Sequence, residues 1–569
     1  MPPVRPFCLV AALLLTAAAC TPPPSPPASE PSVTVEAPHT DASARRIQAD
    51  VAFLADDLLE GREAGTRGHE LAALYVARRM QAIGLQPAGD DGGYMQQVPL
   101  LQATRVEEGS SLELIRDGRT TALAFGEEFL PALNFDAADA RVEAPAVFVG
   151  QGVHAPELQH DDFAGVDVRG KIAVLFAGSP ARFDNDRRAF HASSRQKLAA
   201  LVERGAVGAV FIGTRDSESR SPWSRSQENW QRPGMRLRDA DGRGIDTFPE
   251  LRVVASTSAA AASALFAGSG RAPAALFALA EDGTPGSFEL PGTIRLRAST
   301  RLESAESRNV VGRLPGRDPV LDAEHVVFTA HLDHIGIGAP VGGDSIYNGA
   351  LDNALGVAVM LEAARDLAWS DQSPKRSMLF VAVTAEEKGL LGAEWFVRSP
   401  TVARESLVAN VNVDMPVLLT PTRDVVPIGL EHSTLQPQVE AAARAQGVAL
   451  SPDPFPEQNV FVRSDQYAFI RAGIPAVYLK GGVQASADDD DAREVLAGFM
   501  RDRYHQPSDD LSQSIQYADA ARLAQLNARI GRAVGDGLQR PAWNAGDFFG
   551  DRFGAQAASP APEAQPAAQ

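Results

Sequence analysis

The sequence predicts an α/β fold with a doubly wound, mixed but mostly parallel sheet, into which a separate β-rich domain is inserted. Two observations carry this prediction. From about residue 305, strand-like apolar runs alternate with helical runs, a pattern typical of βαβ units. Between about 140 and 290, short β-rich runs are separated mainly by turns. The chain has 569 residues, 44% of them hydrophobic, which is enough for two or three domains with a sizeable core.

The first twenty residues, MPPVRPFCLVAALLLTAAAC, place one arginine before an apolar run and small residues before Cys20. This pattern predicts a secretory signal peptide over 1–20. Small residues directly before a cysteine resemble a bacterial lipoprotein signal, although Ala17 stands where a leucine is usual. We therefore expect an exported protein, attached to a bacterial membrane only by a lipid on Cys20 and facing the periplasm or the exterior. The alternative is a soluble periplasmic protein cleaved nearby.

The segments next to the signal and at the other end of the chain have biased compositions. Residues 21–41 are rich in proline and serine and predict a linker. Residues 546–569 are rich in alanine, proline and glutamine, and we expect them to be disordered. Residues 42–135 open with helical periodicity, a glycine-punctuated turn (GREAGTRG) and a second helix, and we assign them to the same domain as residues 301–545.

The two remaining segments differ in pattern. Residues 136–300 form the predicted insert, with the β-rich runs APAVFVGQGV, GKIAVLFAG and GAVGAVFIGT and without a cluster of titratable residues. A polar excursion within it covers 219–245. The strand-like runs of residues 301–545 are EHVVFTA (324–330), SMLFVAVTA (377–385), LVANVNVDM (407–415) and IPAVYLK (474–480).

Charge and cysteine content limit the chemistry of the chain. The formal net charge of −19 argues against a nucleic-acid-binding protein, which would present a basic stripe. The two cysteines, Cys8 and Cys20, both lie in the first twenty residues. The rest of the chain therefore has no disulfide, no cysteine nucleophile and no cysteine ligand for a metal, so that a metal site must use histidines and carboxylates.

Polar residues collect at the ends of the predicted strands, where open α/β sheets bind their ligands. A helix begins just after one further aspartate, and the loop RYHQPSDD supplies one more histidine. The strand ends give His331, Asp333, Glu386, Glu387 and Asp414; the other two residues are Asp352 and His505.

Carboxylates gathered in this way repel one another unless a cation lies between them. Histidine with aspartate or glutamate is the ligand set expected for zinc when cysteine is absent. Two ions about 3.5–4 Å apart, bridged by one carboxylate, form a hydrolytic centre. One bridging aspartate, two histidines and two further carboxylates would give each of two Zn²⁺ ions three protein ligands and leave room for a shared water.

The motifs AHLDHIG, NGALDNALG, VTAEEKGLLGAEWF, NVDMP and YHQPSDD resemble those of the co-catalytic di-zinc exopeptidases, metallopeptidase family 28. Leucyl-type aminopeptidases and glutamate carboxypeptidase II are members of that family. The order and spacing of the five motifs match that family over roughly 305–540. The stretch DDFAGVDVRGKIAVLFAGSP resembles the protease-associated domain, a non-catalytic insert of several exported peptidases.

The resemblance implies a role for each of these residues. Asp352 bridges both zinc ions, and Glu386 is the general base that takes a proton from the bridging water. Asp333 hydrogen-bonds the ring of His331, and the peptide bond between Asp352 and Asn353 is cis. The remaining ligands are His331 and Asp414 for one ion, Glu387 and His505 for the other.

Three nearby residues have weaker assignments. Tyr504 either steadies the substrate carbonyl or is a packed aromatic residue, and Asp465 in RSDQYAF is a candidate lining residue of the substrate pocket. His334 is expected to be structural or to line the pocket rather than to bind metal.

We expect an aminopeptidase that acts on peptides. Carboxypeptidase relatives that prefer acidic C-terminal residues carry arginines after the Gly-Ile pair, where this chain has Tyr478, with Lys480 as the nearest cation. A dipeptidase or a carboxypeptidase of the same family remains an alternative. A receptor-like relative without activity and a glutaminyl cyclotransferase with one zinc are less well supported, because the full ligand set is present. The sequence leaves oligomeric state, native metal and side-chain preference open.

Overall fold

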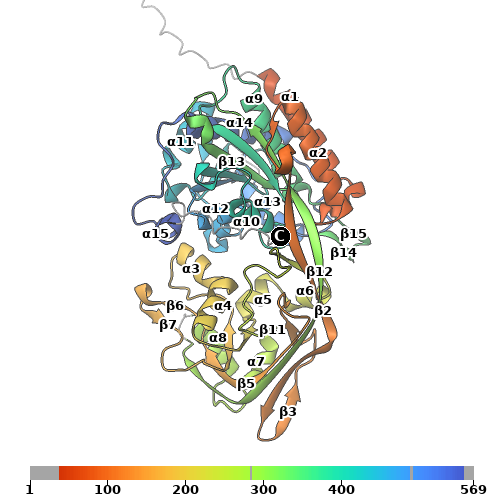
Figure 1. Ribbon diagram of the computed structural model, residues 1–569, viewed down its shortest axis with the longest axis vertical. Helices are drawn as coiled ribbons and strands as arrows, with labels where there is room; N and C mark the ends of the chain where they lie inside the picture. The colour runs from red at the N-terminus through yellow and green to blue at the C-terminus, as the bar shows by residue number, and fades with distance from the viewer. Residues whose placement is uncertain (1–36, 282–284, 487–490, 556–569) are drawn as a thin grey trace, which may run out of the picture.

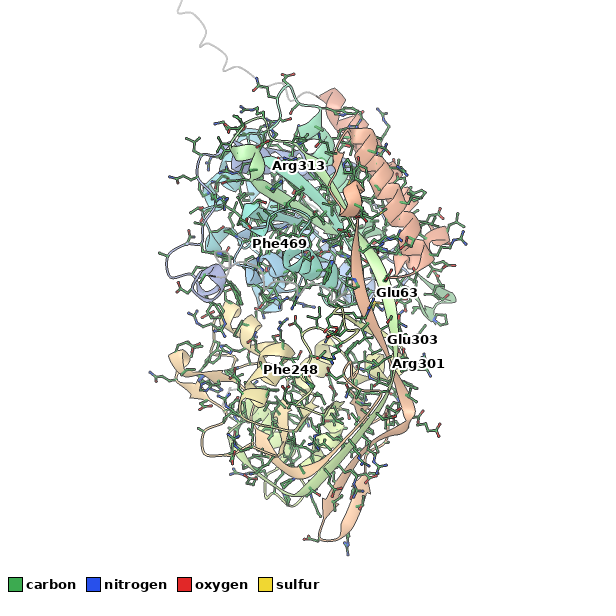
Figure 2. All side chains as sticks on the ribbon, viewed as in Figure 1. Glu63, Phe248, Arg301, Glu303, Arg313 and Phe469 are labelled. Carbon is green, nitrogen blue, oxygen red and sulfur yellow. The ribbon has the colours of Figure 1, made fainter. Side chains whose placement is uncertain are left out.

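The computed structural model describes residues 37–281, 285–486 and 491–555, which fold into two lobes joined by two long strands (Figure 1). The strands are β2 (Met95–Arg116) and β12 (Ser287–Leu314). We call residues 37–94 and 325–555 the large lobe and residues 119–281 the insert lobe. Figure 2 marks Phe469 in the large lobe and Phe248 in the insert lobe.

The large lobe is built on a mixed, mostly parallel sheet, as predicted. Its strand order is β19-β18-β20-β17-β13-β16-β12. The four inner strands are parallel to one another, whereas β12 and β18 run antiparallel to their inner neighbours. The strands are β13 (His325–His331), β16 (Ser377–Val383), β17 (Leu407–Val413), β18 (Asp424–Ile428), β19 (Ala449–Leu450) and β20 (Ala476–Gly481).

Helices cover both faces of this sheet, which explains why its central strands are buried at every position rather than at alternate ones. Val326 and Phe328 of β13 pack on one side, and Val327 between them packs on the other. The first face is covered by α1 (Ala37–Leu54), α2 (Arg67–Ile83), α9 (Leu355–Ala368), α11 (Gln436–Gln446) and α14 (Tyr517–Asp536). The second is covered by α10 (Leu391–Arg398) and α12 (Gln466–Arg471).

The insert lobe continues the same sheet through β12, in the order β12-β5-β8-β9-β11-β4. Its inner strands from β5 to β11 are parallel, and β4 pairs antiparallel with β11. The strands are β3 (Arg119–Ala122), β4 (Phe129–Pro131), β5 (Asp139–Val149), β8 (Ile172–Phe176), β9 (Gly208–Ile212), β10 (Gly234–Leu237) and β11 (Val253–Thr257). The helices include α3 (Asn185–Ala192), α4 (Ser194–Glu203), α6 (Trp223–Glu228) and α8 (Pro273–Glu281).

The lobes do not divide where the sequence suggested. The expected boundary between 300 and 301 lies inside β12, which pairs with β5 of the insert lobe and with β16 of the large lobe. Strands β3 and β4 were assigned with residues 42–135 to the first domain, yet β4 pairs with β11 of the insert lobe. A strand shared by two lobes has no break in composition, so sequence patterns do not locate this boundary.

The ends of the chain differ in part from expectation. Helix α1 begins at Ala37, inside the predicted linker 21–41. The predicted tail 546–569 is helical over α15 (Phe548–Phe553), where Phe549 is completely buried. The predicted signal peptide and Cys20 lie outside the described residues. Within the described ranges, no helix has both the length and the apolar character needed to cross a membrane.

Helix α15 packs at the junction of the two lobes, beside α3 (Figure 1). The ring of Phe190 in α3 lies 5.6 Å from that of Phe548, centroid to centroid. His432, from the large lobe, contacts Asp547 at the start of α15 through a 2.6 Å pair of Nδ1 and Oδ2. Burial opposes a charge on His432, but this hydrogen bond and the carboxylates of Asp186 and Glu431 raise its pKa above the ordinary value.

This raised pKa predicts a pH-dependent contribution to stability. It is fully present below the unfolded pKa of about 6.5 and is lost as the pH rises through the folded pKa. The change Asp547→Asn keeps a helix-capping oxygen but removes the charge. Urea unfolding should therefore show a larger loss of unfolding free energy for the variant at about pH 5.5 than at about pH 8.5. The exposed Asp551→Asn serves as the control, and equal losses at both pH values would contradict the assignment.

Candidate metal centre

Three adjacent strands bring their terminal residues together, as the sequence predicted. His331 is the last residue of β13, Asp414 follows β17 directly, and Glu386 and Glu387 follow β16 after a two-residue turn. The strand order β17-β13-β16 makes these three strands neighbours. Their carboxyl ends meet at one edge of the sheet, so the side chains that follow them converge.

The first group of possible metal ligands consists of His331, Asp352 and Asp414. Nε2 of His331 lies 3.2 Å from Oδ1 of Asp352 and 3.0 Å from Oδ1 of Asp414. All three residues are buried, and one ligand atom of each lies within 4.8 Å of the others. Nδ1 of His331 lies 3.0 Å from the backbone carbonyl of Asp333, to which it is placed to donate. With that proton on Nδ1, the lone pair of Nε2 faces the carboxylates.

The second group shares Asp352 and adds His334 and Glu387. Nδ1 of His334 lies 2.8 Å from Oε1 of Glu387. Nε2 of His505 lies 3.1 Å from Oε2 of Glu387 and 3.3 Å from Oδ2 of Asp352. The structure thus brings His505 to the expected place and adds His334, which we had expected to be structural. Sequence gave only one signal for His334, its position three residues after His331.

Asp352 is held in place by the backbone around it. It lies in the turn Ala350–Ala354 that precedes α9, and the peptide bond to Asn353 is cis, as expected. The carboxylate of Asp509 accepts hydrogen bonds from the amides of Leu351 and Asp352, both at 3.0 Å. The side chain of Asn353 donates to the carbonyl of Val413 at the end of β17. Sequence reasoning assigned no role to Asp509, although it lies in the motif that contains His505.

A buried arginine ties the loops of the site together. Arg62, in the turn GREAGTRG, is 1% exposed and donates to the carbonyls of Leu332, Asn348 and Gly349. Burial lowers its pKa to about 10, although nearby carboxylates, Asp509 foremost, oppose that shift. It therefore keeps its positive charge beside an acidic site. Arg62 could not be predicted from the sequence, because nothing in its motif distinguishes it from a surface arginine.

Asp333 contacts the ring of His331, as expected, and does so through its backbone carbonyl. The carboxylate instead accepts from the amides of Glu386 and Glu387, at 3.0 and 3.3 Å. Asp333 thus orients the pair of glutamates as well as the histidine, through two different atoms. Burial raises the pKa of its carboxyl to about 6.

The charges at this edge of the sheet favour cations. Burial raises the pKa of Glu386 well above its usual range, with Glu387 and Asp414 adding to the rise and His331 opposing it. Burial also acts against ionisation of Asp352, but contacts with His331 and His505 lower its pKa well below the ordinary value. Nδ1 of His334 and Oε1 of Glu387 are buried and lie 2.8 Å apart, but their orientation does not give a well-formed hydrogen bond. Buried histidine nitrogens and carboxylate oxygens that face one another are a donor set that fits zinc.

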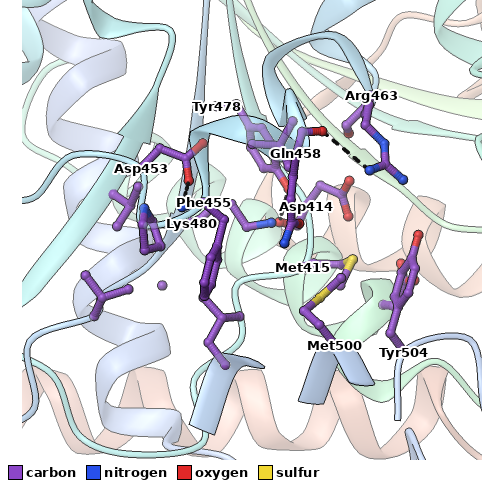
Figure 3. Close-up of a pocket in the computed structure, with 18 of the residues that line it drawn as sticks. Asp414, Met415, Asp453, Phe455, Gln458, Arg463, Tyr478, Lys480, Met500 and Tyr504 are labelled. Atoms are coloured by element: carbon purple, nitrogen blue, oxygen red, sulfur yellow. Dashed lines mark hydrogen bonds between the residues drawn. The ribbon is translucent and has the colours of Figure 1, made fainter. Parts of the chain in front are cut away.

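A cavity opens beside the first group (Figure 3). Glu386 and Tyr504 line it, and the Tyr504 ring stacks on that of His505 with centroids 3.9 Å apart. Its wall is mostly apolar, with charged groups at Asp453, Arg463 and Lys480. The apolar lining residues include Met415, Val426, Phe455, Val483, Leu496 and Met500.

Asp465, expected to line this cavity, does not. It precedes α12 directly and is fully buried, and neither carboxylate oxygen has a hydrogen-bond partner among the described residues. Burial raises its pKa well above the ordinary value. The sequence placed Asp465 close to the site correctly, but the direction of its side chain depends on packing that the sequence pattern does not report.

Known proteins match the part of the chain that carries this site. Residues 309–530 match the model of Peptidase family M28. Over 142 residues the chain is 32% identical to Aminopeptidase NAALADL1 of Mus musculus, an alignment that covers 24% of this chain and 17% of that protein. It is 24% identical over 396 residues to a Glutamate carboxypeptidase 2 homolog of Caenorhabditis elegans, covering 61% of this chain and 46% of that one. The chain thus matches less than half the length of either curated relative.

Solved structures with a similar fold include the aminopeptidase from Aneurinibacillus sp. strain AM-1. Its TM-score is 0.51 at 19% identity, covering 86% of this chain and 94% of that one. The likeness confirms the predicted fold class.

Asp509 provides a test of the geometry at this site. The change Asp509→Asn keeps the shape but leaves one of the two amides of Leu351 and Asp352 facing an NH₂ group. We expect zinc affinity, measured by competition with a chelator, to fall by about 10-fold to 100-fold. Asp510→Asn is the matched control. Among the described residues, the Asp510 carboxylate accepts hydrogen bonds from the amide and the hydroxyl of Ser512, within its own turn. Equal affinities of the two variants would show that Asp509 does not position a ligand.

Proposed function

Residues 309–530 belong to peptidase family M28, as the motifs predicted, and from this premise we propose that the protein is an exported zinc aminopeptidase acting on peptides. The observation that carries the proposal is the position of Asp352, a buried carboxylate shared by two groups of histidine and carboxylate ligands. That arrangement supports the two-ion hydrolytic centre expected from the sequence.

Five side chains would hold the two ions. Asp352 would bridge them, with one histidine and one further carboxylate completing each site; these are His331 with Asp414, and Glu387 with His505. Bound zinc would lower the pKa of a bridging water and polarise the scissile carbonyl. His334 contacts Glu387 and Asp352 from the buried side. We assign it to orient Glu387 rather than to bind metal.

Glu386 is the proposed general base. It lines the cavity next to His331, Asp352 and Asp414, and Asp333 fixes its backbone amide. A carboxylate there would take a proton from the attacking water and return it to the leaving amine. The hydroxyl of Tyr478 donates to the backbone carbonyl of Asp414 at 2.8 Å and so steadies the loop that carries this ligand.

Support for an aminopeptidase comes from the cavity. A free α-amino group is a cation, and Asp453, a carboxylate of the cavity wall outside the proposed ligand set, would attract it. The mostly apolar wall suits the side chain of an N-terminal residue. Lys480 in the same wall is the observation that keeps a carboxypeptidase or dipeptidase as the second candidate, since it offers a cation to a carboxylate. Assays with blocked amines and with blocked carboxylates separate the two.

Export and lipid attachment rest on residues 1–20 alone. The proposed anchor is acylated Cys20, and Cys20→Ser should abolish labelling by a fatty-acid probe. Labelling that persists in the variant would refute the anchor without affecting the proposed activity.

The change Glu386→Gln tests the proposed base. It removes the proton acceptor but retains the volume, so hydrolysis of aminoacyl-nitroanilides should fall by about 10²-fold to 10⁴-fold. Zinc content should stay that of the wild type. The exposed Glu405→Gln is the control and should keep full activity. Activity within a few-fold of wild type in Glu386→Gln would exclude Glu386 as the base.

The two histidines near Glu387 can be told apart by metal counting. His505→Gln should reduce bound zinc from about two ions per chain to about one, whereas His334→Gln should keep about two with altered affinity. Mass spectrometry under native conditions gives both counts. The reverse pattern would assign His334 as the ligand.

A further inference from the structure

A second crevice reaches the metal centre from the side of the insert lobe. It is lined by Glu387 and His505 of the large lobe and by residues of β2, β4, α6 and β10. His505 also lines the cavity described above, so the two spaces meet at the proposed metal site from different sides. If the first cavity takes the N-terminal residue, the crevice lies where the rest of the peptide must go.

The crevice is cationic in a protein whose formal net charge is −19. Five of its lining residues are positively charged, and its one carboxylate is Glu387, a proposed zinc ligand. The five are Arg105, Arg225, Arg232, Arg236 and Lys388.

Most of these charges lack an acidic partner. Lys388 pairs with Glu63 at 2.6 Å, whereas Arg105 donates to the carbonyls of Pro131 and Trp230. Among the residues that the structure describes, Arg105, Arg225 and Arg232 form no ion pair. Cations left unpaired beside a proposed active site favour an anionic group of the substrate.

Arg232 is the best placed of the three. It comes from the polar excursion of the insert lobe, and its guanidinium carbon lies 5.1 Å from the centre of the Tyr347 ring in the large lobe. One of its terminal nitrogens is buried without a hydrogen-bond partner among the described residues. A Cβ at Gly338 would overlap this nitrogen, so a glycine there leaves room for the guanidinium. The contact with Tyr347 and the close fit at Gly338 restrict the guanidinium, so its remaining N–H groups keep a limited range of directions.

We propose that this crevice binds a carboxylate in the part of the substrate that follows the cleaved bond, and that Arg232 selects for it. The inference rests on the proposed peptidase function and adds a substrate class, peptides with a carboxylate close to the cleaved bond. Two sources supply that chemistry, the C-terminus of a short peptide and an acidic side chain. The insert lobe then contributes directly to specificity, because the selecting residue belongs to it.

Three peptides separate the sources: Leu-Ala-Ala, its C-terminal amide, and Leu-Glu-Ala amide. Wild-type kcat/KM should be higher for a carboxylate-bearing peptide than for Leu-Ala-Ala amide. Arg232→Met should lower kcat/KM for the carboxylate-bearing peptide by about 10-fold to 100-fold, through a higher KM. The same change should leave kcat/KM for Leu-Ala-Ala amide within about 2-fold of wild type. Arg232→Lys should retain part of the preference. The exposed Arg119→Met in β3 is the control.

A binding measurement separates this inference from the proposed activity. Calorimetry with Glu386→Gln, alone and combined with Arg232→Met, compares the free-acid and amide peptides without turnover. Tighter binding of a carboxylate peptide that depends on Arg232 supports the inference even if no peptide is cleaved, in which case only the proposed function fails. Equal effects of Arg232→Met on the binding of all three peptides would overturn the inference, since they indicate a merely structural contact with Tyr347. No effect on any peptide would also overturn it, since Arg232 would then have no role.

Discussion

Mutual repulsion of buried carboxylates is the constraint on which the site depends. The carboxylates of Asp352, Glu387 and Asp414 lie close to one another, and Glu386 lies beside them. All four are largely shielded from water. Ionised carboxylates so close together are unfavourable at low dielectric unless positive charge is interposed. Arg62 supplies part of that charge. Two cations shared through Asp352 would supply the rest, and this is why the geometry suggests metal ions rather than proton sharing.

The fold meets this constraint with backbone groups more than with side chains. Strands β17, β13 and β16 end side by side, which fixes three of the ligands without any special residue. Asp333 and Asp509 each accept hydrogen bonds from two successive backbone amides, and Arg62 donates to the carbonyls of four residues. These contacts hold the loops rigidly, so the ligands remain close despite their charge. Rigid support of this kind is what a metal site needs to keep its ligands oriented.

The strand-end rule predicted His331, Asp333, Glu386, Glu387 and Asp414 because local patterns locate the carboxyl ends of strands. The motif match added Asp352 and His505. The features of the site that the sequence could not predict depend on three-dimensional packing. Segments distant in the chain fix the burial of Arg62, the complete burial of Asp465 and the two different contacts of Asp333. The lobe boundary could not be predicted for a related reason, since β12 belongs to both lobes. Helix α15 was not predicted because a short aromatic helix in an alanine-rich end looks like disorder.

We propose that two metal ions lie on either side of Asp352. A crystal structure of the protein grown with zinc, with diffraction collected above and below the zinc absorption edge, would test this directly. Two anomalous peaks about 3.5–4 Å apart are expected, with one carboxylate oxygen of Asp352 on each. A single peak, or two peaks that do not share Asp352, would contradict it.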